Sequence, residues 1–409
     1  MMYHLSHAAK TFDTEINLPY SKSISNRLLM IHAMCHDSFE IINLSDANDT
    51  KLLAEALAQE ATTIDVDDCG TAFRFLTAYL ATKKGEFILT GSQQMKQRPI
   101  EQLVDALYQL GAEIHYLEKK GFPPLKISGK PLRGGRVDID ASVSSQFISA
   151  LLLIAPTLKQ GLALNIQGNT LSKPYIIMTI ECMRYFGIDV RWTKNIITVS
   201  PQAYKAKNIT VEADWSSLAF FLQAMVFSKY SYLKINGVCE NSWQGDIKVL
   251  ELYKRFGIKS DFENGYLLLS KENNNYPSND FNVNLLNFPD LAPAYCCTIA
   301  GTRKMATVGG LDNLKFKESH RLKALQMELK KINQNCQFNN TDFSLFSSKL
   351  APPKEAFSSH DDHRICMSLA PFALLFDIQL EGVETVSKSF PNFWNEMKKI
   401  GFTINRITR

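Results

Sequence analysis

The chain has 409 residues, of which 45% are hydrophobic and 21% charged, and this ordinary globular composition at this length suggests two or more domains. Its net charge of +4 gives no indication of a nucleic-acid partner but suits a small anionic substrate. No window approaches the roughly 18 to 20 apolar residues of a membrane span, no signal peptide is apparent, and the eight cysteines form no CxxC pair, so we expect a cytoplasmic protein with reduced thiols.

The predicted elements, in chain order, form a unit that recurs about six times. Each copy has an apolar helix, a short strand that often ends in Gly, an amphipathic helix, and one or two further strands. The first helices begin at or near Ser25, Thr71, Phe147, Ser216, Leu291 and Arg364, and the strands after them span 39–44, 86–90, 162–167, 233–236, 305–308 and 378–380. The second helices span 49–59, 100–110, 175–186, 246–256, 319–332 and 392–400, and the strands that close copies two to six include 125–128, 196–199, 266–269, 343–346 and 403–404.

The clearest sign of the repeat is a Phe-Gly or Leu-Gly pair after the second helix, since Gly just past a helix is the usual left-handed C-cap. The first copy lacks this Gly and leaves no room for a hairpin between Gln59 and Asp67, so we predict that it is shortened. Three copies in each half predict two similar α/β domains with a boundary near 211–214. The first 19 residues precede the first copy and are compatible with either half.

One early stretch, LPYSKSISNRLLMIHAM from residue 18, combines a cationic, hydroxyl-rich loop with an apolar helix. We predict that the loop contains Lys22 with Ser21, Ser23 and Ser25. Ser23 and Arg27 are four residues apart and would share one helical face. Cations, hydroxyls and backbone N–H groups at a helix start are suited to bind an anion, although a capped helix with solvated charges explains this stretch equally well when it is taken alone.

Similar polar clusters stand at the starts of other predicted helices. They are Gly70–Thr71–Arg74, Ser144–Ser145–Gln146, Asp290 and His363–Arg364 at first helices, and Arg98, Ser172–Tyr175, Lys317–Glu318–Arg321 and Lys388 at second helices. Helix N-termini carry partial positive charge, so copies that pack alike would direct these groups at one cleft that binds a highly charged anion. Taken singly, Arg98 before a proline, Ser144 as an N-cap, and Lys317 with Arg321 on a solvated helix face all have plainer explanations.

Several other classes of site are disfavoured. The sequence has no P-loop, no GxGxxG fingerprint and no GxSxG elbow. The run His360–Asp361–Asp362–His363 is similar to a metal cluster, but no Cys or further spaced ligand accompanies it, so we expect no metal.

The polar clusters resemble the motifs of the 5-enolpyruvylshikimate-3-phosphate synthase family across nearly the whole chain. The matching segments are SKSISNR at 21–27, CGTAFR at 69–74, MKQRPI at 95–100, SSQF at 144–147, SKPY at 172–175, QGD at 244–246, Pro289–Asp290, KESHR at 317–321, DHR at 362–364 and KSFP at 388–391. The resemblance implies an inside-out α/β barrel fold of two similar domains, each with three βαβαββ units, and an active site in the interdomain cleft. It places 20–212 in the first domain, on the shikimate 3-phosphate side, and returns 1–19 to the second domain with 213–409.

The resemblance also implies the reaction: transfer of the enolpyruvyl group of phosphoenolpyruvate to the 5-hydroxyl of shikimate 3-phosphate, with release of phosphate. The reaction proceeds by addition and elimination through a tetrahedral intermediate, on the pathway to chorismate and the aromatic amino acids. It requires no metal or redox cofactor. The expected partners are these two small molecules, with neither nucleic acid nor a membrane, and we expect a monomer.

Site residues follow from the same resemblance, position by position. Shikimate 3-phosphate would be bound by Lys22, Ser23, Arg27, Ser144, Ser145, Gln146, Ser172, Tyr175, Asp290, Asn313 and Lys317. Phosphoenolpyruvate would be bound by Lys22, Gly70, Arg98, Gln146, Arg321, Arg364 and Lys388. Asp290 would remove the proton of the 5-hydroxyl, Glu318 would protonate the methylene carbon, and Lys22 would stabilise phosphate and relay a proton.

Three substitutions depart from the family pattern besides the shortened first copy. Asp68 replaces a usual Asn, Phe75 a frequent Pro and His320 a frequent Asp. Asp68 would place a carboxylate near a phosphate site, so the details of the enolpyruvate pocket and any response to glyphosate stay open.

Two alternatives remain. A UDP-N-acetylglucosamine enolpyruvyl transferase shares the fold, but we would expect a Cys in the loop GSQQMKQR at 91–98, which has none. A non-catalytic anion- or RNA-binding protein on the same repeat is disfavoured by the combined presence of Lys22, Asp290, Glu318 and Lys388.

Overall fold

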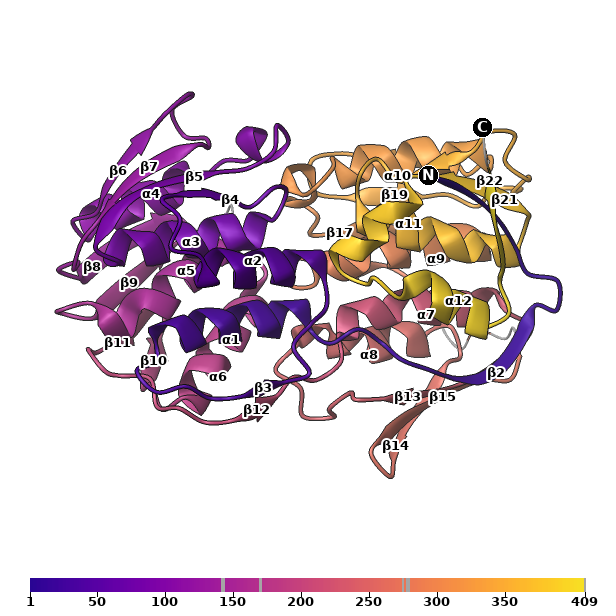
Figure 1. The fold of residues 1–409 in the computed structure, drawn as a ribbon. Helices are drawn as coiled ribbons and strands as arrows, with labels where there is room; N and C mark the ends of the chain where they lie inside the picture. The colour runs from indigo at the N-terminus through magenta and orange to yellow at the C-terminus, as the bar shows by residue number, and fades with distance from the viewer. Residues whose placement is uncertain (141–143, 169–170, 274–275, 277–279, 408–409) are drawn as a thin grey trace. The chain divides into compact units, whose positions relative to one another are not determined.

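The computed structural model describes residues 1–140, 144–168, 171–273, 276 and 280–407 (Figure 1). The chain divides into two compact units. We call Ser21–Val211 the N-terminal unit, and Met1–Tyr20 with Glu212–Arg409 the C-terminal unit. Among the described residues, no helix is both long and apolar enough to cross a membrane.

The N-terminal unit contains six α-helices among its described residues. They are α1 (Lys22–Met34), α2 (Asn48–Ala58), α3 (Gly70–Thr82), α4 (Glu101–Gln109), α5 (Ser145–Ile154) and α6 (Lys173–Tyr185), with 3-10 helices η1 (Met95–Gln97) and η2 (Ala155–Thr157). The strands are β3 (Ile41–Ile42), β4 (Thr63–Asp65), β5 (Gly85–Thr90), β6 (Glu113–Tyr116), β7 (Leu125–Gly129), β8 (Gly135–Asp140), β9 (Leu162–Gln167), β10 (Val190–Thr193), β11 (Ile196–Val199) and β12 (Ile209–Thr210).

The C-terminal unit begins with the two N-terminal strands, β1 (Met2–Ser6) and β2 (Thr11–Ile16). Its helices are α7 (Trp215–Phe227), α8 (Val249–Lys254), α9 (Ala292–Thr302), α10 (Arg321–Lys331), α11 (His363–Leu369) and α12 (Phe393–Lys399), with η3 (Gly245–Lys248), η4 (Pro289–Leu291), η5 (Leu314–Phe316), η6 (Ala370–Leu374) and η7 (Val383–Lys388). Its other strands are β13 (Tyr230–Asn236), β14 (Lys259–Glu263), β15 (Tyr266–Lys271), β16 (Val283–Asn284), β17 (Ala306–Gly309), β18 (Cys336–Phe338), β19 (Phe343–Leu345), β20 (Phe357–Ser358), β21 (Ile378–Glu381) and β22 (Thr403–Ile407).

Five four-stranded sheets in the described part of the chain share one topology. Each has a parallel pair followed by two antiparallel pairings, as in β4-β5-β7-β6 and β8-β9-β11-β10. The same order recurs in β2-β13-β15-β14, β16-β17-β19-β18 and β20-β21-β1-β22. The repeat read from the sequence is therefore present in the fold.

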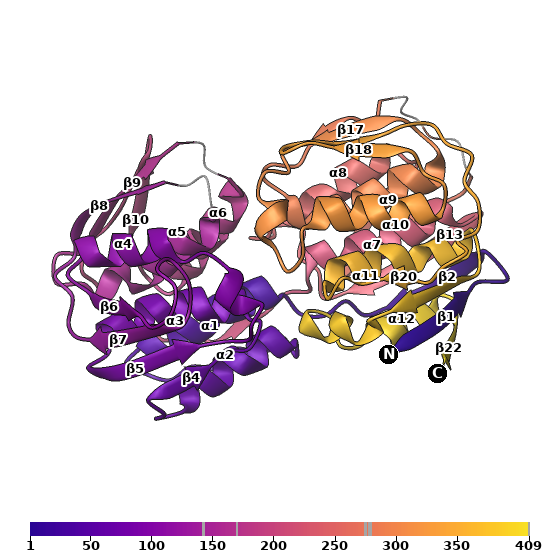
Figure 2. The ribbon, with the colours of Figure 1, turned by 90° about the horizontal axis from the view of Figure 1, so that it is seen from above.

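The N-terminal residues complete two sheets of the C-terminal unit. Strand β1 lies between β21 and β22, where Met2 pairs with Glu381 and with Ile407, and β2 pairs in parallel with β13. The first and last strands of the described chain, β1 and β22, therefore lie side by side in one sheet (Figure 2). Strands of the N-terminal segment therefore pair with strands from the second half of the chain.

The first copy is shortened, as predicted. Its sheet consists of β3 and β12, two residues each, which pair in parallel without the antiparallel strands of the other copies. The strand predicted at 39–44 is therefore limited to Ile41–Ile42. From Ala58 the chain runs directly to Thr63, where β4 begins the second copy.

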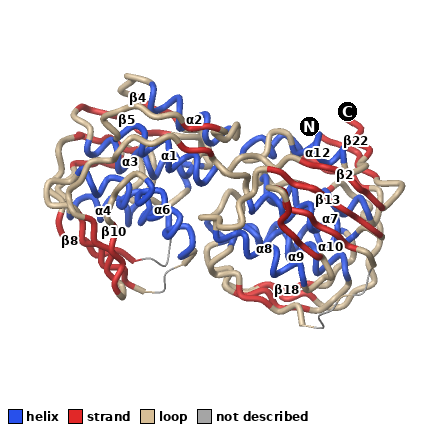
Figure 3. Tube along the Cα trace, turned by 90° about the horizontal axis from the view of Figure 1, so that it is seen from below, coloured by secondary structure: helices blue, strands red, loops and turns tan. Residues whose placement is uncertain are grey.

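The helices form the interior of each unit and the sheets surround them (Figures 2 and 3). All thirteen residues of α7 and all seven of α11 are buried, which is the pattern of helices that are covered on every side. The strands instead alternate buried and more exposed residues, as in β5 and β13, because one face of each sheet packs on the helices. The fold is therefore an inside-out α/β arrangement.

A residue with a positive backbone φ follows the second helix in each of copies two to six. Gly111, Gly187, Gly257 and Gly401 have φ of 91°, 85°, 80° and 94°. In the fifth copy Asn333 takes the place of the glycine, with a φ of 62°. Asn is the other residue that adopts this conformation readily, so the C-cap signal persists without a glycine.

Candidate active site

The start of α1 differs from the prediction. The helix begins at Lys22, because the Ser21 hydroxyl accepts a hydrogen bond from the Ile24 N–H at 3.3 Å and caps the helix. Lys22 and Ser23 therefore lie in the first helical turn and not in a loop. Lys22 Nζ donates to the Asp49 carboxylate at 2.8 Å, and both side chains are largely buried. Asp49, in the first turn of α2, was not among the predicted site residues.

Arg27 is 3% exposed and donates hydrogen bonds to groups of α1, α5 and α6. Its Nε donates to the Thr179 hydroxyl at 2.7 Å and its Nη1 to the Ser23 carbonyl at 2.7 Å. Nη2 donates to the Tyr175 carbonyl at 3.1 Å and to the Ser149 hydroxyl at 3.4 Å. Burial lowers the pKa of Arg27 to about 10. The guanidinium thus joins two predicted site residues, Ser23 and Tyr175, in a fixed arrangement.

Two guanidinium groups lie over the start of α3 because residue 70 is glycine. A Cβ at Gly70 would lie 2.4 Å from Arg74 Nη1 and 2.5 Å from Arg98 Nη1. Arg74 Nη1 donates to the Gln146 side-chain oxygen at 3.0 Å, and Gln146 Nε2 donates to the Thr71 hydroxyl at 3.0 Å. Gly70, Arg98 and Gln146 are thus brought to one place. Arg74, which the resemblance did not assign to a substrate, is the residue that connects them.

The serine clusters stand at helix starts, as expected. Ser144 caps α5 by accepting from the Gln146 N–H at 3.3 Å, and the 9% exposed Ser145 is the first residue of that helix. Ser172 precedes α6 in the left-handed conformation, with φ of 56°. Such a φ is uncommon for serine and occurs often at ligand sites. Its carbonyl accepts from the Tyr175 N–H at 3.0 Å.

The three departures from the family pattern all have local partners. The Asp68 carboxylate accepts a hydrogen bond from the Ser92 hydroxyl. The Phe75 ring is buried with its centroid 5.7 Å from Arg27 Cζ, within cation–π range. The imidazole of His320 caps α10 by accepting from the Lys323 N–H at 3.3 Å, which is the task that an Asp performs at an N-cap.

In the C-terminal unit, Asp290 lies in η4 among three cations. Its carboxylate contacts Arg364 at 2.9 Å, Lys317 at 3.4 Å and Arg321 at 3.4 Å. Burial opposes ionisation of Asp290, but the three positive charges outweigh it and hold its pKa well below the usual range. Burial lowers the pKa of Lys317, while Asp290 opposes that shift.

Arg321, at the first position of α10, connects a second group of carboxylates. Its Nε and Nη2 donate to the Asp362 carboxylate at 2.7 and 3.2 Å, and Nη2 also donates to Glu318 at 2.7 Å. Arg321 and Asp362 are 1% and 0% exposed. The three carboxylates raise the pKa of Arg321 against the effect of burial. Asp362 was not predicted as a site residue, although it opens the DHR motif that contains Arg364.

Asp362 and Asp290 also fix the position of Arg364. Asp362 caps α11 by accepting from the Arg364 N–H at 2.9 Å. The Arg364 side chain, 6% exposed, donates to the Asp290 carbonyl at 3.1 Å and to the Ser216 hydroxyl at 3.1 Å. Two further predicted residues, Asn313 and Lys388, lie at the start of η5 and at the end of η7.

The run 360–363 does not form a metal cluster in the structure. His360 contacts Glu328 and Asp362 contacts Arg321. Among the described residues there is no group of three or more His, Cys, Asp or Glu side chains placed to hold a metal ion.

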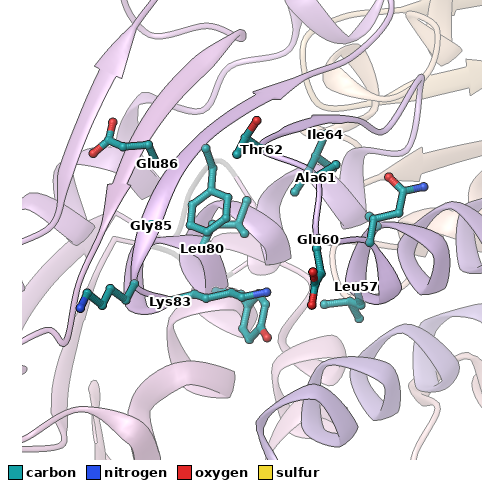
Figure 4. A pocket seen from close by; sticks show the side chains of 14 residues that line it. Leu57, Glu60, Ala61, Thr62, Ile64, Leu80, Lys83, Gly85 and Glu86 are labelled. Carbon is teal, nitrogen blue, oxygen red and sulfur yellow. The ribbon is translucent and has the colours of Figure 1, made fainter.

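A pocket of about 320 Å³ lies beside the shortened first copy, and no predicted site residue lines it (Figure 4). Its wall includes Glu60, Ala61 and Thr62, from the short connection between α2 and β4, with Lys83 and Glu86 from the end of α3 and from β5. The pocket therefore borders the connection that replaces a hairpin in this copy.

Residues 53–397 match the family described as EPSP synthase (3-phosphoshikimate 1-carboxyvinyltransferase). The chain belongs to this family. It is 38% identical over 407 residues to a 3-phosphoshikimate 1-carboxyvinyltransferase of Bacteroides fragilis strain YCH46. The aligned region covers 98% of this chain and 99% of the relative. It is 33% identical over 416 residues to the protein of that name from Sulfurovum sp. strain NBC37-1. That alignment covers 94% of this chain and 96% of the relative.

The EPSP synthase fold is also found by structural comparison. A 2.37 Å structure of EPSP synthase from Acinetobacter baumannii covers 99% of this chain and 100% of its own, with a TM-score of 0.77 and 22% sequence identity. The predicted family, fold and enzyme class are therefore confirmed. The chain is an enolpyruvyl transferase of the shikimate pathway, and the UDP-N-acetylglucosamine alternative is not favoured.

Four cations of the candidate site already have carboxylate partners. Lys22 contacts Asp49, and Lys317, Arg321 and Arg364 all contact carboxylates. Any anion that bound these cations would therefore compete with these carboxylates.

Proposed function

We propose that the substrate and catalytic residues of this EPSP synthase are those implied by the family motifs, supplied by both units. The two units would be its two enolpyruvyl transferase domains, 20–212 and 1–19 with 213–409, and the active site would lie between them. The observation that carries this proposal is the buried network in the C-terminal unit. Both carboxylates proposed for proton transfer, Asp290 and Glu318, share Arg321 as a partner there.

Asp290 is the proposed base for the 5-hydroxyl of shikimate 3-phosphate. A carboxylate held by Arg364, Lys317 and Arg321 is a weak base, which is what the lowered pKa of Asp290 expresses. We infer that the carboxylate and phosphate of phosphoenolpyruvate take over Arg321 and Arg364, the two arginines assigned to that substrate. Loss of these partners would raise the pKa of Asp290, so the residue would become basic only when both substrates are bound.

Glu318 is the proposed acid that protonates the methylene carbon of phosphoenolpyruvate. Its carboxylate accepts a hydrogen bond from Arg321 at 2.7 Å, so the proposed acid lies beside an arginine assigned to phosphoenolpyruvate. The same exchange of partners would weaken this contact and free the Glu318 side chain to approach the methylene carbon. Phosphoenolpyruvate would then act on both carboxylates through one arginine.

In the N-terminal unit, the proposed phosphoenolpyruvate ligands are Lys22, Gly70, Arg98 and Gln146. The Arg98 guanidinium over the start of α3 would bind a phosphate oxygen together with the positive end of that helix. Lys22 would exchange Asp49 for phosphate and stabilise the leaving group. Fixed cations in a site that excludes water would contribute most of the stabilisation of the transition state.

The cellular context is likewise a proposal. We propose a cytoplasmic monomer that acts on two small molecules and binds no nucleic acid. The weak net charge is in keeping with this.

Phosphate release tests the proposed function directly. The protein should release phosphate when shikimate 3-phosphate and phosphoenolpyruvate are both present, and not when UDP-N-acetylglucosamine replaces the shikimate substrate. Release of phosphate from phosphoenolpyruvate only when UDP-N-acetylglucosamine is the second substrate would assign the chain to the other enolpyruvyl transferase activity. Binding of either anion without turnover would favour the non-catalytic alternative.

A further inference from the structure

The turn that carries Asp362 contains two successive residues in the left-handed conformation. His360 has φ of 51° and Asp361 has φ of 55°, and neither is glycine. Side chains disfavour this region because Cβ approaches the backbone, so two such residues in succession persist only when other contacts hold them. The strained pair directly precedes the residue that binds both Arg321 and the backbone of Arg364.

Glu328 supplies contacts that hold this turn. It lies on α10 and is 1% exposed. One carboxylate oxygen lies 2.7 Å from His360 Nε2, and the other accepts from the Ser358 N–H at 2.9 Å and from Lys331 Nζ at 2.8 Å. These partners lower the pKa of Glu328 against the effect of burial. The carboxylate thus contacts the turn on both sides of Ser359, through the backbone N–H of Ser358 and through the side chain of His360.

Helix α10 attaches to this turn at two points. Arg321 and Glu328 are seven residues apart, so they lie two turns apart on the same buried face of the helix. Arg321 binds Asp362 and Glu328 binds His360. The two contacts act as a clasp: one fixes the position of the carboxylate, and the other fixes the strained backbone that presents it.

We propose that Glu328 and His360 are positioning residues for Arg321 and Arg364, the arginines assigned to phosphoenolpyruvate. This inference rests on the proposed function for that assignment. Without the His360 contact the left-handed pair relaxes and Asp362 moves. The Arg321 guanidinium then loses its carboxylate partner, and Arg364 loses the cap that holds its backbone at the start of α11. Because small misplacements of binding groups are costly in catalysis, the effect should appear in the use of phosphoenolpyruvate.

A matched pair of glycine variants separates this role from relief of strain. His360→Gly and Asp361→Gly each place a glycine in the left-handed turn, but only the first removes the contact with Glu328. We expect His360→Gly to raise KM for phosphoenolpyruvate by about tenfold and to change KM for shikimate 3-phosphate by less than about twofold. Asp361→Gly should leave both constants near those of the wild type.

Three further measurements test the inference. His360→Gln, which can still offer a hydrogen bond to Glu328, should recover part of the loss. The double variant Glu328→Gln/His360→Gly should be no worse than the poorer single variant, because both changes break one contact. Thermal unfolding, with calorimetric binding of shikimate 3-phosphate, checks that each variant folds; should His360→Gly fail this check, His360→Asn replaces it, since Asn tolerates a positive φ.

Two kinetic outcomes would overturn the inference alone. Equal kinetic constants for the His360→Gly and Asp361→Gly variants, or parallel rises in both KM values, would show that the clasp is structural only. A wild-type protein that forms no product from the two substrates would instead overturn the proposed function, and this inference with it.

Discussion

Arg27 in the N-terminal unit and the cations around Asp290 in the C-terminal unit are held in different ways. Arg27 donates to hydroxyl and carbonyl oxygens, which are dipoles without net charge, although Lys22 in the same unit contacts the Asp49 carboxylate. In the C-terminal unit, Lys317, Arg321 and Arg364 contact carboxylates. Dipolar partners leave the positive charge of an arginine uncompensated and ready to attract an anion, whereas carboxylates neutralise it until a substrate replaces them.

This difference suggests separate tasks for the two clusters. A cluster held by dipoles is preorganised and should bind anions with little change in its own structure. A cluster of paired ions responds to binding, because each arginine that turns to a substrate leaves a carboxylate with altered basicity. The proposed proton-transfer residues belong to the second kind of cluster. The following changes test the contrast, from the largest expected effect to the smallest.

Removal of Asp362 should have the largest effect on stability. Asp362→Ala leaves the buried Arg321 without its bidentate partner, and breaking a buried ion pair from one side costs about 3 to 5 kcal/mol of unfolding free energy. The corresponding change in the other unit, Asp49→Ala, should cost less because Lys22 is 14% exposed and can reach water. Urea unfolding of both variants measures the two losses of unfolding free energy. Equal losses would contradict the expected difference between the two ion pairs.

Glu318→Gln should reduce turnover by about 10² or more, which is the usual contribution of a general acid. The amide keeps the shape of the side chain, so binding of shikimate 3-phosphate should survive. Steady-state kinetics and calorimetry measure the two properties separately. Near-normal turnover would exclude Glu318 from the mechanism.

Arg27→Ala should raise KM for shikimate 3-phosphate by about tenfold, and more than it raises KM for phosphoenolpyruvate. The structure adds a reason, because the change leaves the carbonyls of Ser23 and Tyr175 without their donor. Arg27→Lys is the control, since it keeps the charge but cannot reproduce the planar set of donors. A larger effect on phosphoenolpyruvate in either variant would mean that the two substrates are assigned the wrong way round.

The Asp290→Asn variant should lose less stability in acid than the wild type does. The folded-state pKa of Asp290 lies below its unfolded value, so its stabilising contribution is present above the unfolded pKa of about 4 and is lost as the pH falls below it. The wild type should therefore lose more stability than the variant between pH 5 and 2. Denaturant midpoints across this range give the measurement, and parallel curves would show that the three cations do not stabilise the ionised form.

The sequence predicted the repeat well because local signals mark it. Glycine at C-caps and apolar periodicity belong to single elements, and even the shortened first copy was evident from the missing hairpin. The start of α1 was misplaced because Ser21, Ser23 and Ser25 are all plausible caps, and only the hydrogen bond to Ile24 decides between them.

The candidate site was predicted less completely, since contacts distant in sequence decide it. Asp49 and Asp362 hold Lys22 and Arg321 from 27 and 41 residues away. The family motifs name residues expected to touch substrates, and not the groups that hold them in the free protein. The DHR motif was the available signal for Asp362, and Arg74 stood in the CGTAFR segment without an assigned task.

The central claim is that each substrate binds residues of both units. Shikimate 3-phosphate is assigned to Ser23 and Tyr175 in the N-terminal unit and to Lys317 in the C-terminal unit, while phosphoenolpyruvate is assigned to Arg98 in the first and to Arg364 in the second. A ligand that binds residues of both units would favour arrangements of the chain in which it can reach both.

Small-angle X-ray scattering tests this claim most directly. Saturating shikimate 3-phosphate, with or without an analogue of phosphoenolpyruvate, should lower the radius of gyration, and high salt should weaken the effect by screening the charges. An unchanged scattering profile at saturating ligand would contradict the claim and would mean that the two sets of residues do not close around a shared substrate.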